Sequence, residues 1–265
     1  MLNPTFDAAA APPRPASRAD VRVNFAAAAA IMLSWVAIHL GAIFTIDLAE
    51  ATPLMVAGLV LMQTWLSTGL FIIAHDCMHG SFAGPGNGWN RRVGRLALMI
   101  YAGLDYDAMR PAHVAHHRHV GTADDPDFSV ASPRRPLRWL VDFFMGYYSH
   151  MQLVRITVMA LLWMALGASL FNIVLFWAVP ALLALLQLFF FGTFLPHRHE
   201  ARGFADAHRA RSVGPGGLWS VISCFHFGGY HLEHHRFPQL PWWRLPEADT
   251  AVQPADRRGR AEHRL

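Results

Sequence analysis

The class of fold is decided by residues 156–195, which read ITVMALLWMALGASLFNIVLFWAVPALLALLQLFFFGTFL. These 40 residues contain no charged side chain. A single helix of that length would extend for about 60 Å, twice the hydrocarbon thickness of a bilayer. We therefore expect a hairpin of two membrane spans, 156–174 and 176–195, with its turn near Gly167–Asn172 and with Pro180 tolerated inside the second span.

Two further apolar stretches precede this hairpin. Residues 25–46 and 54–74 are each long enough to cross a bilayer, and a short polar turn separates them. All 22 basic residues are Arg, yet 25–74 and 156–195 contain none of them. Because an Arg at the centre of a span costs roughly 2.5–3.5 kcal/mol, spans belong in these intervals. The sequence predicts an all-α integral membrane protein with about four transmembrane helices.

The composition excludes an ordinary soluble enzyme. Hydrophobic residues make up 54% of the chain and charged residues only 15%, whereas soluble domains carry about 25% charged residues. The sequence pI of about 9.6 comes from Arg residues that flank the apolar runs, without an aromatic-studded basic face. This placement favours positive charge next to a membrane over binding to nucleic acid.

Four spans would place both Arg-rich segments, 75–155 and 196–249, on the same side as the N-terminus. The excess of Arg assigns that side to the cytoplasm. The predicted organisation is a single membrane domain, 25–249, between two flexible tails, 1–24 and 250–265. Cys77 and Cys224 do not form a C-x-x-C pair, so a disulfide framework is not expected.

Histidines gather in four places, each at a predicted boundary between a span and the cytoplasm. In H-D-C-M-H, H-V-A-H-H and H-L-E-H-H, spacings of three and four residues place the imidazoles on one helical face. A His-rich solvated surface would not repeat the H-x-x-H-H spacing. The histidines concerned are His75, His79, His113, His116, His117, His231, His234 and His235, with His197 alone at the end of the last span.

Eight or nine imidazoles are too many for one metal ion and suit two ions, each with about four or five nitrogen ligands. Zinc is satisfied by three or four ligands and often uses Cys, which the pattern lacks. Imidazole also suits iron, which performs oxygen chemistry that zinc cannot. Soluble di-iron bundles need a Glu-x-x-His motif that this chain does not have. The pattern therefore predicts a dinuclear iron centre at the membrane face.

The strings around these histidines resemble a known family. Within the membrane fatty-acid desaturase and hydroxylase superfamily, they are similar to the bacterial β-carotene ketolases. The resemblance covers roughly residues 70–246, with Cys77 and the extra His119 as departures that leave every clustered histidine in place. The strings are H-D-C-M-H-G-S-F (75–82), H-H-R-H-V-G-T-A-D-D-P-D-F (116–128), F-G-T-F-L-P-H-R (191–198), F-H-F-G-G-Y-H-L-E-H-H (225–235) and P-W-W-R-L-P (241–246).

The resemblance implies a reaction. The ring 4-methylene of β-carotene would be oxidised to a ketone, giving canthaxanthin by way of echinenone, and hydroxylated carotenoids would lead to astaxanthin. Two Fe²⁺ ions would be the cofactors and O₂ the co-substrate. Electrons would come from a separate ferredoxin-like donor, since the chain shows no nucleotide or haem motif. The protein would lie in the bacterial inner membrane, with its termini and histidine boxes on the cytoplasmic side.

The resemblance also suggests roles for single residues. His197 stands where desaturases carry an extra metal ligand, and Thr193 precedes it by one helical turn. His226 is the alternative for that extra ligand. Metal-bound imidazoles usually donate their other N–H to a carboxylate or carbonyl, so acidic residues near the histidines are candidates to orient them. The three Asp residues that follow H-V-A-H-H are equally consistent with a solvated acidic turn. These candidates are Asp76, Asp124, Asp125, Asp127 and Glu233, and His226 joins them as a neighbour of the site.

Three other functions remain open at this point. A fatty-acyl desaturase or hydroxylase of the same superfamily would carry the same histidine boxes. A carotene hydroxylase would stop at the alcohol. A metal transporter or sensor is the alternative that is not an enzyme, and it requires ionisable residues along the spans. Only His39 lies within a predicted span, where it either takes part in the function or extends to the interface between membrane and water.

Overall fold

The computed structural model describes residues 13–14, 16–200, 203–204 and 206–251, and within them the fold is all-helical, without strands. Among the described residues, three helical segments are long and apolar enough to cross a membrane: α1 (Arg18–Thr45), α2 (Pro53–His79) and the continuous segment Leu170–His197. A fourth apolar helix, α6 (His150–Ala165), is shorter. Its 16 residues would extend for about 24 Å, less than the thickness of a bilayer core.

The hairpin in the longest apolar run turns at the start of the predicted region. Helix α6 begins six residues before the predicted span and ends at Ala165, and Gly167 then adopts a left-handed conformation with φ of 100°. Ser169 caps the next helix by accepting a hydrogen bond from the Phe171 N–H. Because the turn takes Leu166–Ser169, the returning helix gains residues that the prediction assigned to the outgoing span.

The returning segment, Leu170–His197, is unbroken although it contains Pro180 and Pro196. It comprises α7 (Leu170–Ile173), the π-helical η1 (Val174–Ala178), α8 (Val179–Phe189), the π-helical η2 (Phe190–Phe194) and α9 (Leu195–His197). A proline removes a backbone donor and clashes with the preceding turn. A wider π turn stands before each proline and accommodates it, so the helix continues to His197.

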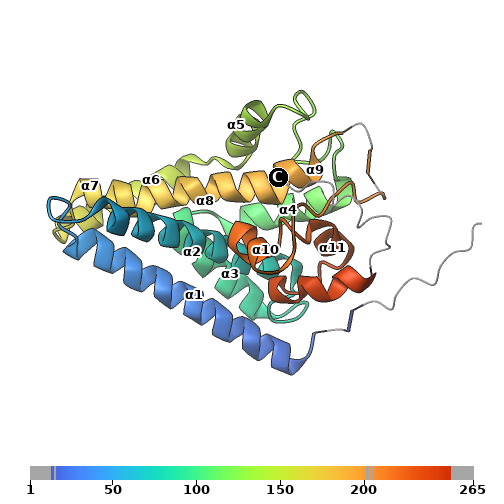
Figure 1. The fold of residues 1–265 in the computed structure, drawn as a ribbon, viewed down its shortest axis with the longest axis horizontal. Helices are drawn as coiled ribbons and strands as arrows, with labels where there is room; N and C mark the ends of the chain where they lie inside the picture. Colours follow the sequence, from blue (N-terminus) through green and yellow to red (C-terminus); the bar gives the residue numbers. More distant parts are fainter. Residues whose placement is uncertain (1–12, 15, 201–202, 205, 252–265) are drawn as a thin grey trace, which may run out of the picture.

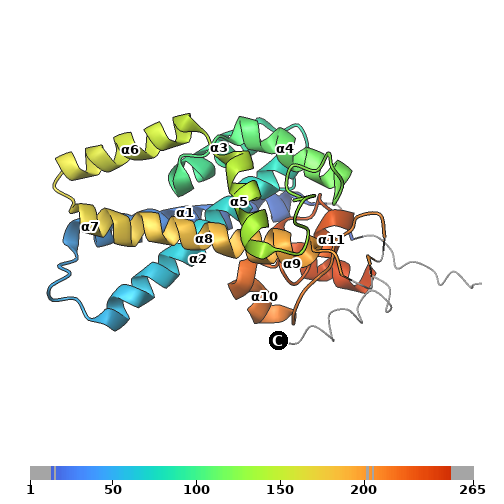
Figure 2. The ribbon, with the colours of Figure 1, turned by 90° about the horizontal axis from the view of Figure 1, so that it is seen from above.

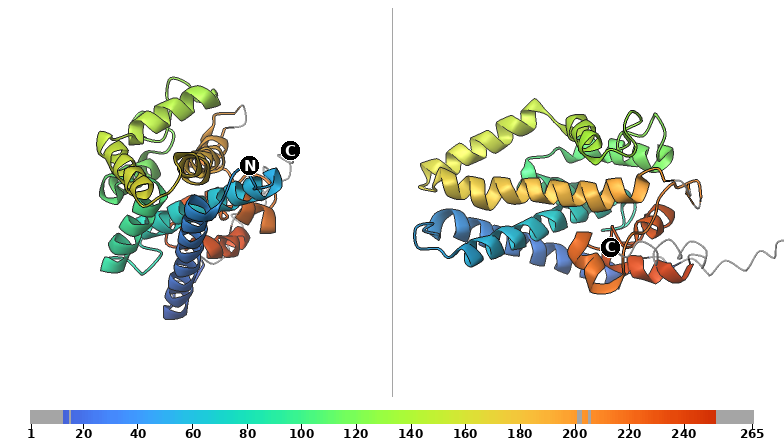
Figure 3. Two further views of the ribbon diagram at one scale, coloured as in Figure 1. Left: turned by 90° about the vertical axis from the view of Figure 1, so that its left-hand side faces the viewer. Right: turned by 45° about the horizontal axis from the view of Figure 1, so that its top comes forward.

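The long helices run side by side along the long axis of the molecule, with the α1–α2 and α6–α7 connections at one end (Figures 1 and 2). The short helices of the two Arg-rich segments gather at the other end, as the rotated views also show (Figure 3). These are α3 (Gly88–Ala102), α4 (Tyr106–His119), α5 (Pro136–Tyr147), α10 (Gly217–Cys224), α11 (His231–Arg236) and the 3₁₀ helix η3 (Trp242–Ala251).

The first helix starts earlier than the predicted span. Ser17 and Asp20 form a capping box, and the Asp20 carboxylate also binds Arg14 and the fully buried Arg244 of η3. This cluster ties the start of α1 to the C-terminal part of the domain. Residues 18–24 of the predicted N-terminal tail are therefore helical, while residues 1–12, 15 and 252–265 lie outside the described residues.

The loop before the third histidine box is anchored on α2. Phe225 has a left-handed backbone with φ of 47°, and its ring stacks on Trp65 with 4.5 Å between centroids. Gly69, one helical turn further along α2, makes room for that ring. A Cβ atom on Gly69 would lie 2.7 Å from Phe225 Cζ and 3.1 Å from Ile31 Cγ2. The contact fixes the position of the chain that leads into α11.

We expect Gly69→Ala to lower the thermal unfolding temperature in detergent, because the added methyl overpacks this contact at a cost of about 1–3 kcal/mol. Gly58→Ala, on the same helix, is the control, since a Cβ atom there meets nothing within 4 Å. Removing a helical Gly normally stabilises by up to about 1 kcal/mol. If both variants melted at or above the unfolding temperature of the unmodified protein, the packing argument would be wrong.

Candidate metal centre

The structure brings the nine predicted histidines together at the end of the bundle where the short helices gather, which we call the cap. His75 and His79 lie on the last turns of α2, the second box lies on α4, His197 ends α9, and the third box lies on α11. The nine divide into two groups, and within each group one nitrogen atom of every histidine lies within 4.8 Å of those of the others. The first group is His75, His79, His113, His117 and His234; the second is His116, His197, His231 and His235.

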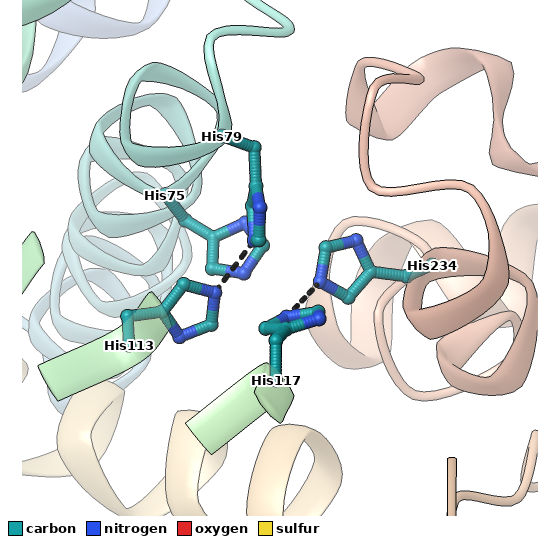
Figure 4. Close-up of side chains that lie close together, drawn as sticks. All are labelled: His75, His79, His113, His117 and His234. Carbon is teal, nitrogen blue, oxygen red and sulfur yellow. Dashed lines mark hydrogen bonds between the residues drawn. The ribbon is translucent and has the colours of Figure 1, made fainter. Parts of the chain in front are cut away.

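Helical spacing explains this division. Residues four apart differ by only about 40° around a helix, so each i, i+4 pair points the same way. His113 and His117 accordingly share the first group, and His231 and His235 share the second. The remaining residue of each H-x-x-H-H box, His116 or His234, points to the other group. Figure 4 shows the five side chains of the first group converging from α2, α4 and α11.

The distances inside the groups are short. In the first group, His79 Nε2 lies 2.7 Å from His113 Nε2, and His117 Nε2 lies 3.0 Å from His234 Nε2. In the second group, His231 Nε2 lies 2.9 Å from His197 Nε2 and 3.0 Å from His235 Nε2. Two nitrogens that bind one ion at right angles, with bonds of about 2.1 Å, are about 3.0 Å apart.

The hydrogen bonds of the second group leave ring nitrogens that can bind a cation. The His197 Nδ1–H donates to the Arg209 carbonyl at 2.9 Å, and the His231 Nδ1–H donates to the Phe227 carbonyl at 3.1 Å. A neutral imidazole carries one ring hydrogen, so both Nε2 atoms then present lone pairs. Two lone pairs that face each other at 2.9 Å repel unless both nitrogens bind the same cation. The residues present therefore fit a bound metal ion.

Burial keeps the clustered histidines in the form that binds metal. It is the largest cause that lowers the pKa of His113, His117, His231, His234 and His235 well below the ordinary value, and the neighbouring histidines lower the pKa further. A charged imidazolium has no free lone pair, whereas a neutral imidazole does. These five histidines therefore present uncharged ligand nitrogens at neutral pH.

Asp125 holds His116. The His116 Nδ1–H donates to Asp125 Oδ1 at 2.9 Å, and the backbone N–H groups of Gly121 and Asp127 bind the same carboxylate. Burial opposes the charged form of His116, but the Asp125 hydrogen bond and the charges of Asp127 and Asp125 raise its pKa overall. The contact fixes the ring and directs Nε2 away from the carboxylate.

The other candidate neighbours take different positions. The Asp76 carboxylate lies 3.9 Å from His75 Nδ1 and accepts a hydrogen bond from the Trp242 N–H at 3.0 Å. Glu233 accepts a hydrogen bond from the Ser212 hydroxyl, and Asp124 is exposed. His226 lies outside both groups, with its ring against Tyr230 and Trp242.

A cavity runs beside both groups. Its wall includes His75 and His113 from the first group and His116 and His231 from the second. Thr193 from η2 also lines it. Much of the remaining wall is apolar and includes Phe71 of α2, Met109 of α4, Phe143 of α5, Leu188 of α8 and Phe227 of the loop before α11. Such a wall suits an apolar molecule placed against the histidines.

We expect Asp125→Asn to lower the amount of divalent metal that the purified protein retains, because His116 loses the negative charge that makes it a better ligand. Outer partners of this kind typically change metal affinity by about 10–100-fold. Asp124→Asn is the matched control one residue away. Elemental analysis after dialysis against a weak chelator measures the difference, and equal retention by the two variants would contradict this role for Asp125.

Comparisons with known proteins place this geometry in a family. The family model described as fatty acid desaturase matches residues 50–158 and 147–264. The chain is 43% identical to a β-carotene ketolase of Paracoccus sp. strain PC1, over 88% of this chain and 95% of that protein. It is 43% identical to the β-carotene ketolase of a second Paracoccus strain, over 83% and 89% of the two chains.

A more distant relative is a β-carotene ketolase of Haematococcus lacustris. It is 34% identical over 82% of this chain and 75% of its own length. The family match and the extent of these similarities agree with the helical bundle and with its paired histidine groups. The chain belongs to the β-carotene ketolases of the fatty acid desaturase family.

Proposed function

We propose that this protein is a membrane di-iron oxygenase that oxidises the ring 4-methylene of β-carotene to a ketone. Echinenone is the product after one ring and canthaxanthin after both, and rings that already carry a hydroxyl lead to astaxanthin. The observation that carries this proposal is the largely apolar cavity that borders both histidine groups, in a chain that belongs to the ketolases.

Each ring needs two rounds of oxidation. In the first, CH₂, O₂, two electrons and two protons give CHOH and one water. In the second, CHOH, O₂, two electrons and two protons give a geminal diol and one water, and the diol loses water to leave the ketone. The electrons come from a separate one-electron donor of the ferredoxin class, because the sequence of this chain shows no nucleotide-binding or haem-binding motif.

We assign the five histidines of the first group to one Fe²⁺ ion and the four of the second group to another. Neutral imidazoles without thiolates suit iron, and iron supplies the activation of O₂ that ring oxidation requires. Asp125 and the carbonyls of Arg209 and Phe227 orient three of the four rings in the second group. The apolar cavity walls position the substrate ring and exclude water.

The arrangement of the helices supports four crossings. Helix α2 ends at the histidine cap, and α7 starts at the opposite end of the long axis (Figures 1 and 2), so the chain has to travel that axis once between them. Helix α6 makes this passage, and its exposed Leu153, Val158 and Leu161 suit contact with lipid. With the Arg-rich cap in the cytoplasm, a carotenoid from the bilayer and an electron donor from the cytosol meet at the iron ions.

In bacteria that make β-carotene, we expect this chain to produce echinenone and canthaxanthin, which chromatography and absorption spectra identify. His117→Ala removes a ligand of the first group and should abolish both products. Unchanged carotenoids in cells whose membranes contain the protein would contradict the proposal. Hydroxylated carotenoids alone would indicate a hydroxylase, and altered fatty acids would indicate a desaturase.

The division of the histidines also predicts a metal count. The purified protein should hold two iron ions per chain, and His234→Ala and His235→Ala should each hold fewer, because these adjacent residues belong to different groups. His119→Ala is the control, since His119 is exposed and lies outside both groups. A single ion in the unmodified protein, or full iron content in both ligand variants, would show that the assignment is wrong.

A further inference from the structure

One polar pair on the cavity wall belongs to neither histidine group. Tyr147, the last residue of α5, donates a hydrogen bond from its hydroxyl to the carboxylate of Asp127. Both residues line the cavity, together with His116 and His231. Because the Tyr147 hydroxyl bonds Asp127, the Tyr147 oxygen lies at the polar part of the wall, on the side of His116.

Asp127 is not needed to hold the nearby histidine. Asp125 already accepts the His116 Nδ1–H at 2.9 Å, whereas the nearest oxygen of Asp127 is 3.9 Å from that nitrogen. The Asp127 backbone is fixed instead, because the buried Trp139 of α5 donates its indole N–H to the Asp127 carbonyl at 2.7 Å. Asp127 is therefore placed to orient Tyr147.

The chemistry of this pair distinguishes the species that occupy the cavity during the reaction. Since the Tyr147 hydrogen is committed to Asp127, the phenolic oxygen offers a lone pair to a bound ring. The starting methylene has no polar hydrogen, and the ketone has none on its new oxygen. An O–H at this carbon that can donate to Tyr147 is present in the intermediate alcohol and in the geminal diol that follows it, and it is lost when the diol gives the ketone.

We propose that Tyr147, positioned by Asp127, accepts a hydrogen bond from the ring 4-hydroxyl of the intermediate and retains that ring for the second oxidation. The inference rests on the proposed ketolase function and adds a residue that sets its product. Release of the ketone follows from the same contact, because the finished product cannot make it. A net hydrogen bond of ordinary strength corresponds to about a two- to tenfold difference in retention.

The test compares Tyr147→Phe with Tyr148→Phe in cells that make β-carotene. Each variant loses one phenolic hydroxyl, but Tyr148 does not line the cavity, and its ring packs against Phe144 and His150. Chromatography gives the ratio of 4-hydroxylated to 4-keto rings. We expect Tyr147→Phe to raise that ratio by about two- to tenfold and Tyr148→Phe to leave it unchanged.

Supplying the 4-hydroxylated carotenoid directly to membranes separates retention from structural damage. Tyr147→Phe should raise the KM for the alcohol by more than it raises the KM for β-carotene, because only the alcohol donates a hydrogen bond to Tyr147. A proportional loss of alcohol and ketone, or an unchanged ratio, would overturn the proposal. It would also be overturned if Thr193→Val, which alters another polar residue of the wall, raised the ratio and Tyr147→Phe did not.

Two substitutions at Asp127 test its positioning role. Asp127→Asn keeps an oxygen that accepts from Tyr147 and should preserve the product ratio, whereas Asp127→Ala should raise the ratio as Tyr147→Phe does. The same ratio in both variants would overturn the positioning role. Failure of the ketolase function itself is recognised separately, because the unmodified chain would then make no keto-carotenoid.

Discussion

The arrangement of the cap depends on how the facing nitrogen lone pairs of its buried histidines are stabilised. His197 and His231 both donate from Nδ1 to backbone carbonyls, so their Nε2 lone pairs meet at 2.9 Å inside the protein. Burial disfavours the protonation that would otherwise relieve the repulsion. Coordination of one metal ion by both nitrogens would replace this repulsion, and α4, α9 and α11 would then remain packed around the site.

The rest of the fold serves this convergence. Helix α2 provides two of the first group's ligands at its end, and its surface at Trp65 and Gly69 anchors the loop that leads to α11. The π turns before Pro180 and Pro196 keep the returning helix continuous as far as His197. The capping box at Ser17 and Asp20 and the buried Arg244 connect the first helix to the last. Distant parts of the chain are thus tied to one end of the bundle.

The spacing of the histidines was sufficient to predict a cluster, because i, i+4 periodicity is a local property of helices. The group to which each box belongs was not predictable, since it depends on how α2, α4, α9 and α11 approach one another. The carbonyls of Arg209 and Phe227 leave no sequence signal, because every residue has one. Asp125 was among the candidates, but the sequence did not distinguish its contact from the exposed position of Asp124.

The cavity was also beyond sequence reasoning, because its wall combines residues from helices that are far apart in the chain. Two metal ions in the two histidine groups can be detected by anomalous diffraction at the iron absorption edge, from crystals of the protein prepared with iron. We expect two peaks, one among the Nε2 atoms of His197, His231 and His235 and one between His79, His113 and His234. A single peak, or peaks away from these nitrogens, would contradict this assignment.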